Sequence, residues 1–348
     1  MGGAGKQLAI TASALIDRGH DVSIYTYIGQ SLEHTIDERI QYIAEQSATK
    51  NKISEYYKTP WNIRRIVKNN KPDVVISWRA NAGCMTVLGC VGLKVKVVYS
   101  ERSDPYMETN TMLKIATKIC EYSDGGVFQT EKARDYYKRL INKSIVLPNP
   151  VVMNQNVDIL PIPKRNNNIV WIGRIKEPQK RLDVLLEAFQ RIHTSMPNVK
   201  LSIYGDGPDM ENTKALAVKF GLQDFVVFHG AINNAIDTIK NYSLMILSSD
   251  YEGIPNVVIE AFMAGVPVVS TDCSPGGARV LIEDGENGFI VPIRDDAGLA
   301  DKACVLLKNP QKAEKFVKKS LERLKIFDSE KIFNQWDSYL RNIVKNLR

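Results

Sequence analysis

Two glutamates, Glu252 and Glu260, stand eight residues apart in a segment that follows an apolar stretch and opens a predicted helix. Gly253 and Pro255 predict a turn between them, so the helix begins directly after that turn. The first backbone N–H groups of a helix have no partner within it, and they attract an anion such as a diphosphate. Here these groups belong to Asn256, Val257 and Val258. The segment therefore predicts an anion site at a helix start.

The two glutamates are weak evidence by themselves, because chance produces such pairs in most chains. The alternative is a solvent-exposed Glu252 and a Glu260 that serves only as a charge on the helix. The pair gains weight from its surroundings, because a second apolar run over residues 264–269 follows the helix. Strand, turn, helix and strand then follow one another, with Glu252 at the end of the strand and Glu260 on the first turns of the helix.

Two cations, Arg174 and Lys180, stand between a predicted strand and the next predicted helix. Gly173 and Arg174 end the apolar run, and Lys180 follows six residues later. An arginine binds a diphosphate with its forked donors and a lysine binds it as a point charge, so both can reach one diphosphate. The alternative is a pair of surface cations. Three further cations nearby are interpreted as solvated, namely Lys176, Arg181 and Arg191.

Short apolar runs alternate with amphipathic ones along the chain, which predicts parallel sheets covered by helices on both faces. The predicted strands cover residues 22–27, 74–78, 95–99, 126–129, 145–147, 169–172, 200–204, 226–228, 244–247 and 266–270. The predicted helices cover residues 5–18, 61–68, 111–122, 132–141, 181–193, 210–220, 235–241, 256–264, 297–307, 313–324 and 330–347. Ligands of such sheets bind at the carboxyl ends of strands and at helix starts.

A polar stretch punctuated by four prolines between residues 148 and 163 is the best linker in the chain. It divides the alternating pattern into two parts. We therefore expect two doubly wound α/β domains, over residues 1–150 and 151–330, with a cleft between them. A terminal helix over residues 331–348 is expected to pack back toward the first domain.

The composition excludes several classes of protein. The 348 residues are 24% charged and 44% hydrophobic, which is ordinary for a globular protein and excludes disordered, collagenous and disulfide-scaffold proteins. The longest uncharged apolar stretch, residues 82–93, is shorter than the roughly 20 residues of a membrane span. No signal-peptide pattern opens the chain. The five cysteines form no C-x-x-C pair, so we expect a thiol-reduced cytoplasmic protein without structural zinc.

The net charge of +7 is concentrated in the first half, since residues 1–150 carry +6 and residues 151–348 carry +1. A basic half attracts an anionic partner such as a membrane surface, a nucleic acid or a phosphorylated substrate, unless it is merely a soluble surface. Aromatic and cationic residues at positions 56–71 favour docking to the inner face of the cytoplasmic membrane, with an ordinary helix as the alternative. No nucleic-acid-binding motif occurs, so nucleic acid is not an expected partner.

The motifs, in their order along the chain, resemble family 4 of the glycosyltransferases with the GT-B fold. Residues 252–260 match the E-x7-E signature of that family, and the resemblance spans nearly the whole chain. The other matching blocks are residues 2–4, 18–22, 71–75, 147–151, 172–174, 179–180, 204–208, 228–230 and 271–273. The resemblance implies two Rossmann-like domains facing a central cleft, the first for the acceptor and the second for a nucleotide-sugar donor.

The resemblance implies a retaining hexosyltransferase that moves a sugar from a nucleotide-sugar, expected to be a UDP-sugar, to a glycan or polyprenyl-diphosphate-linked glycan. The product would be a surface polysaccharide such as lipopolysaccharide or capsule. Glu260 matches the glutamate that bonds the ribose hydroxyls, and Glu252 matches the one beside the donor sugar. Arg174 and Lys180 match the pair that holds the phosphates and stabilises the leaving group. The other implied donor-binding positions are Gly3, Gly173, Gly230, Ile232, Gly253, Ile254, Pro255, Asn256 and Val257.

The sequence shows no evident nucleophile, which favours a front-face displacement in which the departing phosphate accepts the proton of the acceptor. A nucleophilic role for Glu252 is the alternative. The chain contains no Asp-x-Asp motif, so we expect neither a metal ion nor another cofactor. Arg174, Lys180 and the helix start would take the place of the cation.

Glu101 and Arg102 follow a predicted strand of the first domain, where many family members carry a histidine. This departure is similar to a branch that builds bacterial surface polysaccharides and lipid-linked oligosaccharides. Either residue could contact the donor sugar or the acceptor, and a structural ion pair is the alternative. Asp206, in a Gly-Asp-Gly-Pro turn, either contacts the ligand or only fixes the turn.

Other functions fit the sequence less well. Epimerases and phosphorylases of the GT-B fold lack the block 252–260, and a dehydrogenase would show G-x-G-x-x-G after a first strand. Family members begin with a strand ahead of the Gly2-Gly3 loop, so we expect the first strand of the first sheet to be missing, through a start assigned too late or a truncation. The alternative function is therefore a truncated, catalytically impaired homologue that acts as a binding or scaffold protein.

Overall fold

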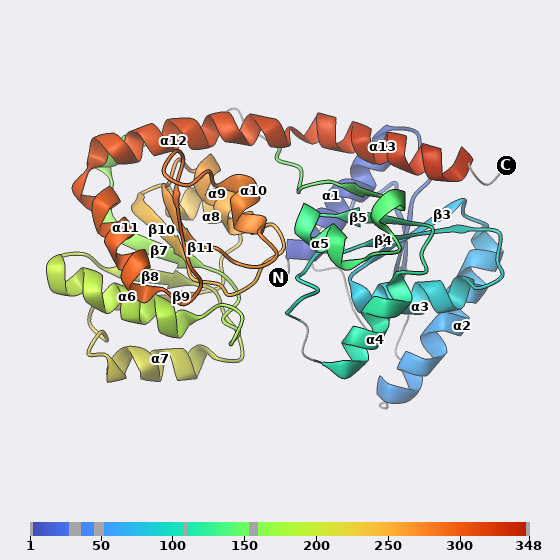
Figure 1. The fold of residues 1–348 in the computed structure, drawn as a ribbon, viewed down its shortest axis with the longest axis horizontal. Coiled ribbons are helices and arrows are strands. Elements are labelled where there is room, and N and C mark those ends of the chain that lie inside the picture. Colours follow the sequence, from blue (N-terminus) through green and yellow to red (C-terminus); the bar gives the residue numbers. More distant parts are fainter. Residues whose placement is uncertain (1–2, 28–35, 45–51, 108–109, 153–158, 346–348) are drawn as a thin grey trace. The chain divides into compact units, whose positions relative to one another are not determined.

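The computed structural model describes residues 3–27, 36–44, 52–107, 110–152 and 159–345 (Figure 1). The chain divides into two compact units. Unit 1 comprises Met1–Pro150 together with Ser329–Arg348, and unit 2 comprises Val151–Asp328. Each unit is built around its own parallel sheet.

Unit 2 contains a six-stranded sheet in the order β12-β11-β10-β7-β8-β9, in which every neighbouring pair is parallel. Its strands are β7 (Asn166–Ile172), β8 (Leu201–Tyr204), β9 (Val226–Gly230), β10 (Tyr242–Leu247), β11 (Val268–Thr271) and β12 (Phe289–Val291). Its helices are α6 (Leu182–Ser195), α7 (Met210–Lys219), α8 (Ala235–Ile239), α9 (Asn256–Met263), α10 (Gly277–Leu281), α11 (Asp296–Lys308) and α12 (Pro310–Leu324). This is the doubly wound arrangement that the sequence predicts.

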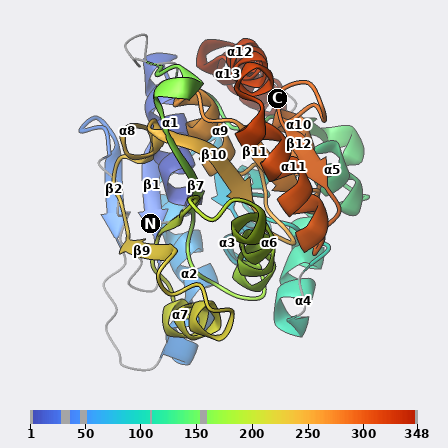
Figure 2. The same ribbon diagram turned by 90° about the vertical axis from the view of Figure 1, so that its left-hand side faces the viewer.

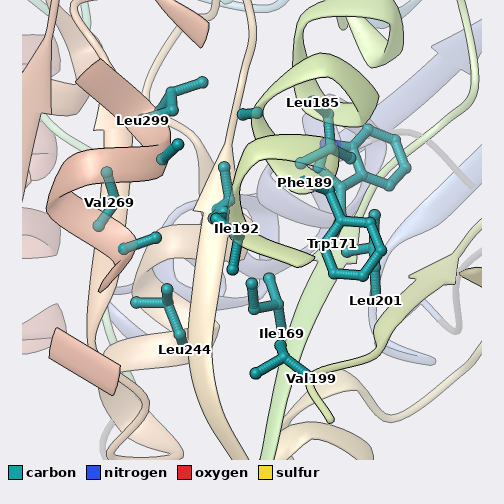
Figure 3. Packing of buried hydrophobic residues seen from close by; sticks show 14 of the residues in the cluster. Ile169, Trp171, Leu185, Phe189, Ile192, Val199, Leu201, Leu244, Val269 and Leu299 are labelled. Atoms are coloured by element: carbon teal, nitrogen blue, oxygen red, sulfur yellow. The ribbon is translucent and has the colours of Figure 1, made fainter. Parts of the chain in front are cut away.

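The core of unit 2 forms where α6 and α11 pack on one face of the sheet, and α8 and α9 lie on the opposite face (Figure 2). Leu182, Leu185, Phe189 and Ile192 of α6 are buried at spacings of three or four positions, so they form an apolar stripe that faces the strands. Figure 3 shows Leu185 and Phe189 of this stripe against Trp171 of β7 and Leu201 of β8, with Leu299 of α11 beside Val269. All six of these side chains are fully buried. Because helices cover both faces of the sheet, the strands are continuous apolar runs.

Unit 1 contains a four-stranded parallel sheet in the order β3-β4-β5-β6 and a two-stranded parallel sheet of β1 and β2. The strands are β1 (Ser23–Thr26), β2 (Gln41–Ala44), β3 (Val74–Trp78), β4 (Lys96–Ser100), β5 (Gly125–Phe128) and β6 (Ser144–Val146). The helices are α1 (Gly3–Asp17), α2 (Lys52–Asn70), α3 (Ala80–Cys90), α4 (Thr111–Cys120), α5 (Glu131–Tyr136) and α13 (Ser329–Lys345). Within the described residues, β1 pairs only with β2 and β3 only with β4. The expected strand ahead of the Gly2-Gly3 loop stays a prediction.

The last helix, α13, belongs to unit 1 and is fastened to it at several points. The ring of Trp336 stacks on that of Trp78, with 6.2 Å between centroids and 8° between planes. The hydroxyl of Tyr339 accepts a hydrogen bond from the backbone N–H of Gly126 at 2.8 Å. Asp337 accepts a 2.6 Å hydrogen bond from the His20 ring. Contacts with β3, with β5 and with the segment after α1 together make α13 part of the unit 1 fold.

The sequence analysis missed four elements of the fold. It predicted neither the strands β2 and β12 nor the helices α3 and α10. The largest errors in helix ends concern α2, which begins at Lys52 and continues through Pro60, and α5, which ends at Tyr136 rather than at residue 141. Residues 153–158 of the predicted linker lie outside the described residues.

The core of unit 2 predicts a clear contrast between two identical substitutions. Val269→Ala removes two buried methyl groups from a fully buried side chain, so we expect a loss of about 2 kcal/mol in the free energy of unfolding. Val218→Ala, on the exposed face of α7 where the side chain is 61% exposed, should change it by less than about 0.5 kcal/mol. Urea unfolding of both variants measures the difference, and equal losses would contradict this core assignment.

Candidate functional site

The carboxyl ends of the unit 2 strands bring the predicted donor-binding residues to one edge of the sheet. Gly173 and Arg174 follow β7, Gly230 ends β9, and the loop with Glu252 follows β10. Strands β7 and β10 are paired directly. Because parallel strands end at a common edge, the segments that follow β7 and β10 are neighbours. These residues therefore come together as the sequence predicts.

Glu252 and Lys180 form an ion pair at this edge. The Lys180 Nζ atom lies 2.5 Å from Glu252 Oε1, and the two side chains are only 13% and 12% exposed. The hydroxyl of Ser249 donates a second hydrogen bond to the same oxygen at 2.8 Å. The backbone N–H of Glu252 donates to the carbonyl of Ser274 at 2.8 Å. The carboxylate is thus held by a cation, a hydroxyl and its own anchored backbone.

Backbone bonds hold the Lys180 loop against the Glu252 loop. The hydroxyl of Ser248 donates to the carbonyl of Lys180 at 2.8 Å. The N–H of Asp250 donates to the carbonyl of Gln179 at 2.9 Å, and the Gln179 side chain donates to the Tyr251 carbonyl at 3.2 Å. Lys180 is therefore positioned by main-chain contacts as well as by its ion pair.

Asp250 is a charged residue of this region that the sequence analysis missed. Its side chain is only 2% exposed, and it accepts a 2.8 Å hydrogen bond from the guanidinium of Arg294. Arg181 lies 3.7 Å from the same carboxylate and 2.7 Å from that of Asp183. The hydrogen bond to Asp250 raises the pKa of Arg294. Asp250 therefore links loops that follow three different strands.

The interpretation of Arg181 as a solvated cation is wrong, because its side chain is only 19% exposed and pairs with two carboxylates. Its backbone has a φ of +50°, a conformation that residues other than glycine rarely adopt. Arg191 is 59% exposed and pairs with Asp296, and Lys176 is exposed. Of the three cations, Arg181 is thus a structural part of the site.

Two glycines allow backbone segments to approach each other closely at the site. A Cβ atom on Gly277 would lie 1.6 Å from the carbonyl oxygen of Gly253. A Cβ atom on Gly205 would lie 1.7 Å from the carbonyl oxygen of Gly173. Any side chain at Gly205 or Gly277 would push the Gly173 or Gly253 segment out of place. The Gly276-Gly277 pair is the sequence signal that could have revealed the close approach to Gly253.

Helix α9 begins at Asn256, after Pro255 and the buried Ile254. No side chain caps this helix start. The N–H of Val258 donates to the carbonyl of Pro255 at 3.0 Å, so the expectation that it is an unpaired donor is wrong. Glu260 lies on the second turn of α9 and is partly exposed. Asn256 and Val257, both partly exposed, remain at the helix start.

Arg174 is exposed, and its guanidinium makes no hydrogen bond or ion pair with the described residues. Asp206 accepts a 2.7 Å hydrogen bond from the N–H of Gly207, so its side chain fixes its own turn. The carbonyl of Gly230 accepts a 2.7 Å bond from the N–H of Gly205, and Ile232 is partly exposed two residues further on.

The remaining predicted site residues lie in unit 1, near the start of α1 and after the end of β4. Gly3 is the first residue of α1, and Gly2 lies outside the described residues. Glu101 is 4% exposed, and its carboxylate accepts hydrogen bonds from the hydroxyls of Tyr99 and Tyr137. Burial and the Glu101 charge raise the pKa of both tyrosines. Within the described residues Glu101 forms no ion pair with Arg102, so the alternative of a structural ion pair between them is wrong.

Within the described part of the chain, no group of three or more His, Cys, Asp and Glu side chains is arranged to hold a metal ion. No helix of that part is long and apolar enough to cross a membrane.

Cys273 provides a test of the packing beneath Glu252. Its side chain is fully buried, and burial, together with the negative charge of Glu252, raises the pKa of its thiol to about 12. The thiol therefore stays protonated at pH 8, and we expect iodoacetamide to modify Cys273 at least tenfold more slowly than the partly exposed Cys304. Mass spectrometry of the native protein measures both rates. Equal rates would show that the packing between Cys273 and the loop of Glu252 opens in solution.

Two family models match the chain, one over each half. Residues 1–155 match the model described as Glycosyltransferase Family 4, and residues 166–309 match the model described as Glycosyl transferases group 1. An uncharacterized glycosyltransferase of Haemophilus influenzae is 26% identical over 343 residues, which cover 97% of this chain and 96% of that protein.

A second relative has a defined activity. The GalNAc-alpha-(1->4)-GalNAc-alpha-(1->3)-diNAcBac-PP-undecaprenol alpha-1,4-N-acetyl-D-galactosaminyltransferase of Campylobacter jejuni is 24% identical, over 96% of this chain and 94% of its own length. Among solved structures, that of Anabaena HepE in complex with UDP-glucose has a TM-score of 0.82 at 18% identity, and covers 98% of this chain and 96% of its own. That likeness shows a common fold.

Proposed function

The chain belongs to the family 4 glycosyltransferases and has their GT-B fold, and from this we propose that it is a retaining enzyme with a UDP-sugar donor. It is related to transferases of lipopolysaccharide and of lipid-linked glycans. The proposed acceptor is a glycan or a polyprenyl-diphosphate-linked glycan of a surface polysaccharide. The observation that carries the proposal is the largely shielded Lys180–Glu252 ion pair at the edge where β7 and β10 end.

The ion pair gives each of its members a role in the proposed reaction. A diphosphate at this edge competes with Glu252 for Lys180, because phosphate oxygens are acceptors for the same ammonium group. Arg174 is exposed, without a partner among the described residues, and supplies a second cation. The start of α9 adds backbone donors and the positive end of a helix dipole. These groups stabilise the charge of the departing nucleotide without a divalent metal ion.

Release from Lys180 leaves the Glu252 carboxylate beside the donor sugar. Ser249 still donates to the carboxylate, and the bond from the Glu252 N–H to Ser274 keeps its backbone in place. In the proposed step, the acceptor oxygen bonds to the anomeric carbon as the bond to the phosphate oxygen breaks on the same face. The acceptor proton passes to that phosphate oxygen. Glu252 stabilises the positive charge that develops on the sugar ring, and Glu260 bonds the ribose hydroxyls.

Substitution of the two glutamates separates binding from chemistry. Glu260→Ala removes charge-assisted hydrogen bonds to the ribose, so we expect UDP to bind about 10- to 100-fold more weakly. Glu252→Gln keeps the size of the side chain but removes the charge, so we expect kcat to fall about 100-fold or more. UDP affinity should be kept or increased, because Lys180 loses the carboxylate that competes with the diphosphate. Calorimetry with UDP, and UDP release from UDP-sugars, measure the two effects.

Glu211→Gln, on the exposed start of α7, is the matched control and should behave as the wild type. A thermal-shift comparison of UDP, GDP and ADP comes first, because stabilisation by GDP or ADP alone contradicts the UDP assignment. A protein that binds UDP but releases none from any UDP-sugar, with or without an acceptor, would instead fit the binding or scaffold alternative. Loss of turnover in EDTA would contradict the metal-independent step.

We also propose that unit 1 docks on the anionic inner face of the cytoplasmic membrane. Trp61 of α2 is 74% exposed, and Leu88 and Val91 at the end of α3 are 47% and 64% exposed. The carbonyl of Pro60 lies against Gly89, so these apolar side chains flank a contact between the two helices. Among the described side chains of α2, the exposed cations are Lys58, Arg65 and Lys68. Exposed aromatic, aliphatic and cationic side chains on one surface are typical of interfacial binding.

Some of the aromatic and cationic residues that the sequence analysis named at positions 56–71 do not support the membrane proposal. Arg64 donates to the carbonyls of Gly89 and Val91 at 3.3 and 2.6 Å, so it caps α3 and is not a free cation. The side chains of Tyr56 and Tyr57 lie outside the described residues.

Liposome flotation at low salt tests the membrane proposal. We expect binding to phosphatidylglycerol-containing vesicles, little binding to phosphatidylcholine vesicles, and a severalfold smaller bound fraction for Trp61→Ser. Val218→Ser removes an exposed apolar side chain from unit 2 and should bind as the wild type. Absence of binding to anionic vesicles, or an equal loss in both variants, would remove the proposal.

A further inference from the structure

Polar and aromatic side chains gather at the carboxyl edge of the four-stranded sheet in unit 1. Trp78 ends β3, Arg102 follows β4, Gln129 follows β5 and Asn149 follows β6. The four strands are parallel, so the residues after them share one edge, which is where parallel sheets bind ligands. Every strand of the sheet thus contributes a side chain to this edge.

The Arg102 guanidinium is held by rings rather than by carboxylates. Its central carbon lies 4.0 Å from the centroid of the Trp78 ring and 5.7 Å from that of Trp336. Nη1 donates a long 3.4 Å bond to Asn149 Oδ1, which already accepts a 2.6 Å bond from Gln129. Nε is buried and has no hydrogen-bond partner. Stacking on a ring fixes the plane of the guanidinium and leaves its in-plane donors for another group.

The neighbouring carboxylate does not neutralise this cation. Glu101 Oε1 accepts the backbone N–H groups of Arg102 and Ser103 at 2.9 and 3.0 Å, and Oε2 accepts the hydroxyls of Tyr99 and Tyr137. Glu101 therefore shapes the loop that carries Arg102. Burial lowers the pKa of Arg102 to about 9, against the opposing effect of the Glu101 charge. A desolvated cation without an ion-pair partner is costly, and an anion that binds there removes the cost.

Arg79 is a second cation at the same edge. It follows Trp78 directly, and its backbone N–H donates to the carbonyl of Ser100, the last residue of β4, at 3.0 Å. Its φ is +73°, a strained conformation for a residue with a side chain, and such strain is concentrated at functional sites. The guanidinium is exposed and makes no hydrogen bond or ion pair with the described residues. It also stands at the start of α3, whose dipole favours an anion.

We infer that Arg102 and Arg79 form an anion site in unit 1 that binds the diphosphate group of a lipid-linked acceptor. The inference rests on the proposed function, which supplies an acceptor of that class. Arg102 presents donors in a fixed plane, as suits two oxygens of one phosphate, and the exposed Arg79 supplies a second cation for the other phosphate. Trp78 and Trp336 are positioning residues, since they hold the guanidinium. Glu101 is another, since it holds the loop.

The test measures pyrophosphate binding by calorimetry with the full-length chain at saturating UDP, which keeps pyrophosphate out of the donor site. We expect Arg102→Gln and Arg79→Gln each to weaken pyrophosphate binding at least tenfold. Arg102→Lys, which keeps the charge but loses the forked donors, should fall between Arg102→Gln and the wild type. The affinity for UDP, measured separately, should stay within twofold in all three variants, because they leave unit 2 unchanged.

Arg139→Gln is the matched control. Arg139 is another arginine of unit 1 whose guanidinium lies over an aromatic ring, with its central carbon 4.4 Å from the centroid of the Tyr122 ring. It should bind pyrophosphate as the wild type. Farnesyl diphosphate and a sugar 1-phosphate distinguish a lipid diphosphate from a single phosphate on the acceptor sugar. Preference for the sugar 1-phosphate, wild-type affinity in Arg102→Gln, or an equal loss in Arg139→Gln would overturn the inference. Failure of UDP to bind at all would instead contradict the proposed function.

Discussion

The parallel pairing of β7 with β10 is the constraint on which the donor site depends. These strands are distant in the sequence but adjacent in the sheet, and their register places the loop of Lys180 against the loop of Glu252. Main-chain bonds between the loops then fix the two side chains, so a partly buried ion pair forms at the strand ends. Such a pair is costly in itself, and the enclosing hydrogen bonds offset the cost. At the carboxyl edge of its own sheet, unit 1 has a different arrangement, in which Arg102 stacks on Trp78.

Much of the sheet structure was predictable because its strands are covered on both faces. Residues 244–247, for example, are fully buried and read as a continuous apolar run. Strand β2 was missed because three of its four residues are exposed, so it lacks an apolar run. Strand β12 is a buried apolar run of three residues, as short as β6, and was overlooked although that signal is present. Helix α3 lies between α2 and α4 and has apolar or small residues all round, so it lacks the amphipathic period on which a helix prediction depends.

The motifs identified the residues of the donor site but not their mutual contacts. A six-residue spacing from Arg174 to Lys180 suggests two cations for one diphosphate, yet Lys180 pairs with Glu252 while Arg174 stays exposed. The contacts of Asp250 with Arg181 and Arg294 join loops that only the tertiary fold brings together. The positive φ of Arg79 also has no sequence signal, because glycine is the residue normally expected there.

The helix α13 gives the fold an unusual order along the chain. Unit 1 contains both the first and the last helix, so the whole of unit 2 is an insertion into it, entered after Pro150 and left before Ser329. Exchange of the donor half between related enzymes therefore requires two junctions rather than one. A chimaera joined only near residue 150 would bring a foreign α13 to the Trp78 ring. Unit 1 can thus pass intact to a new donor unit only if its own last helix goes with it.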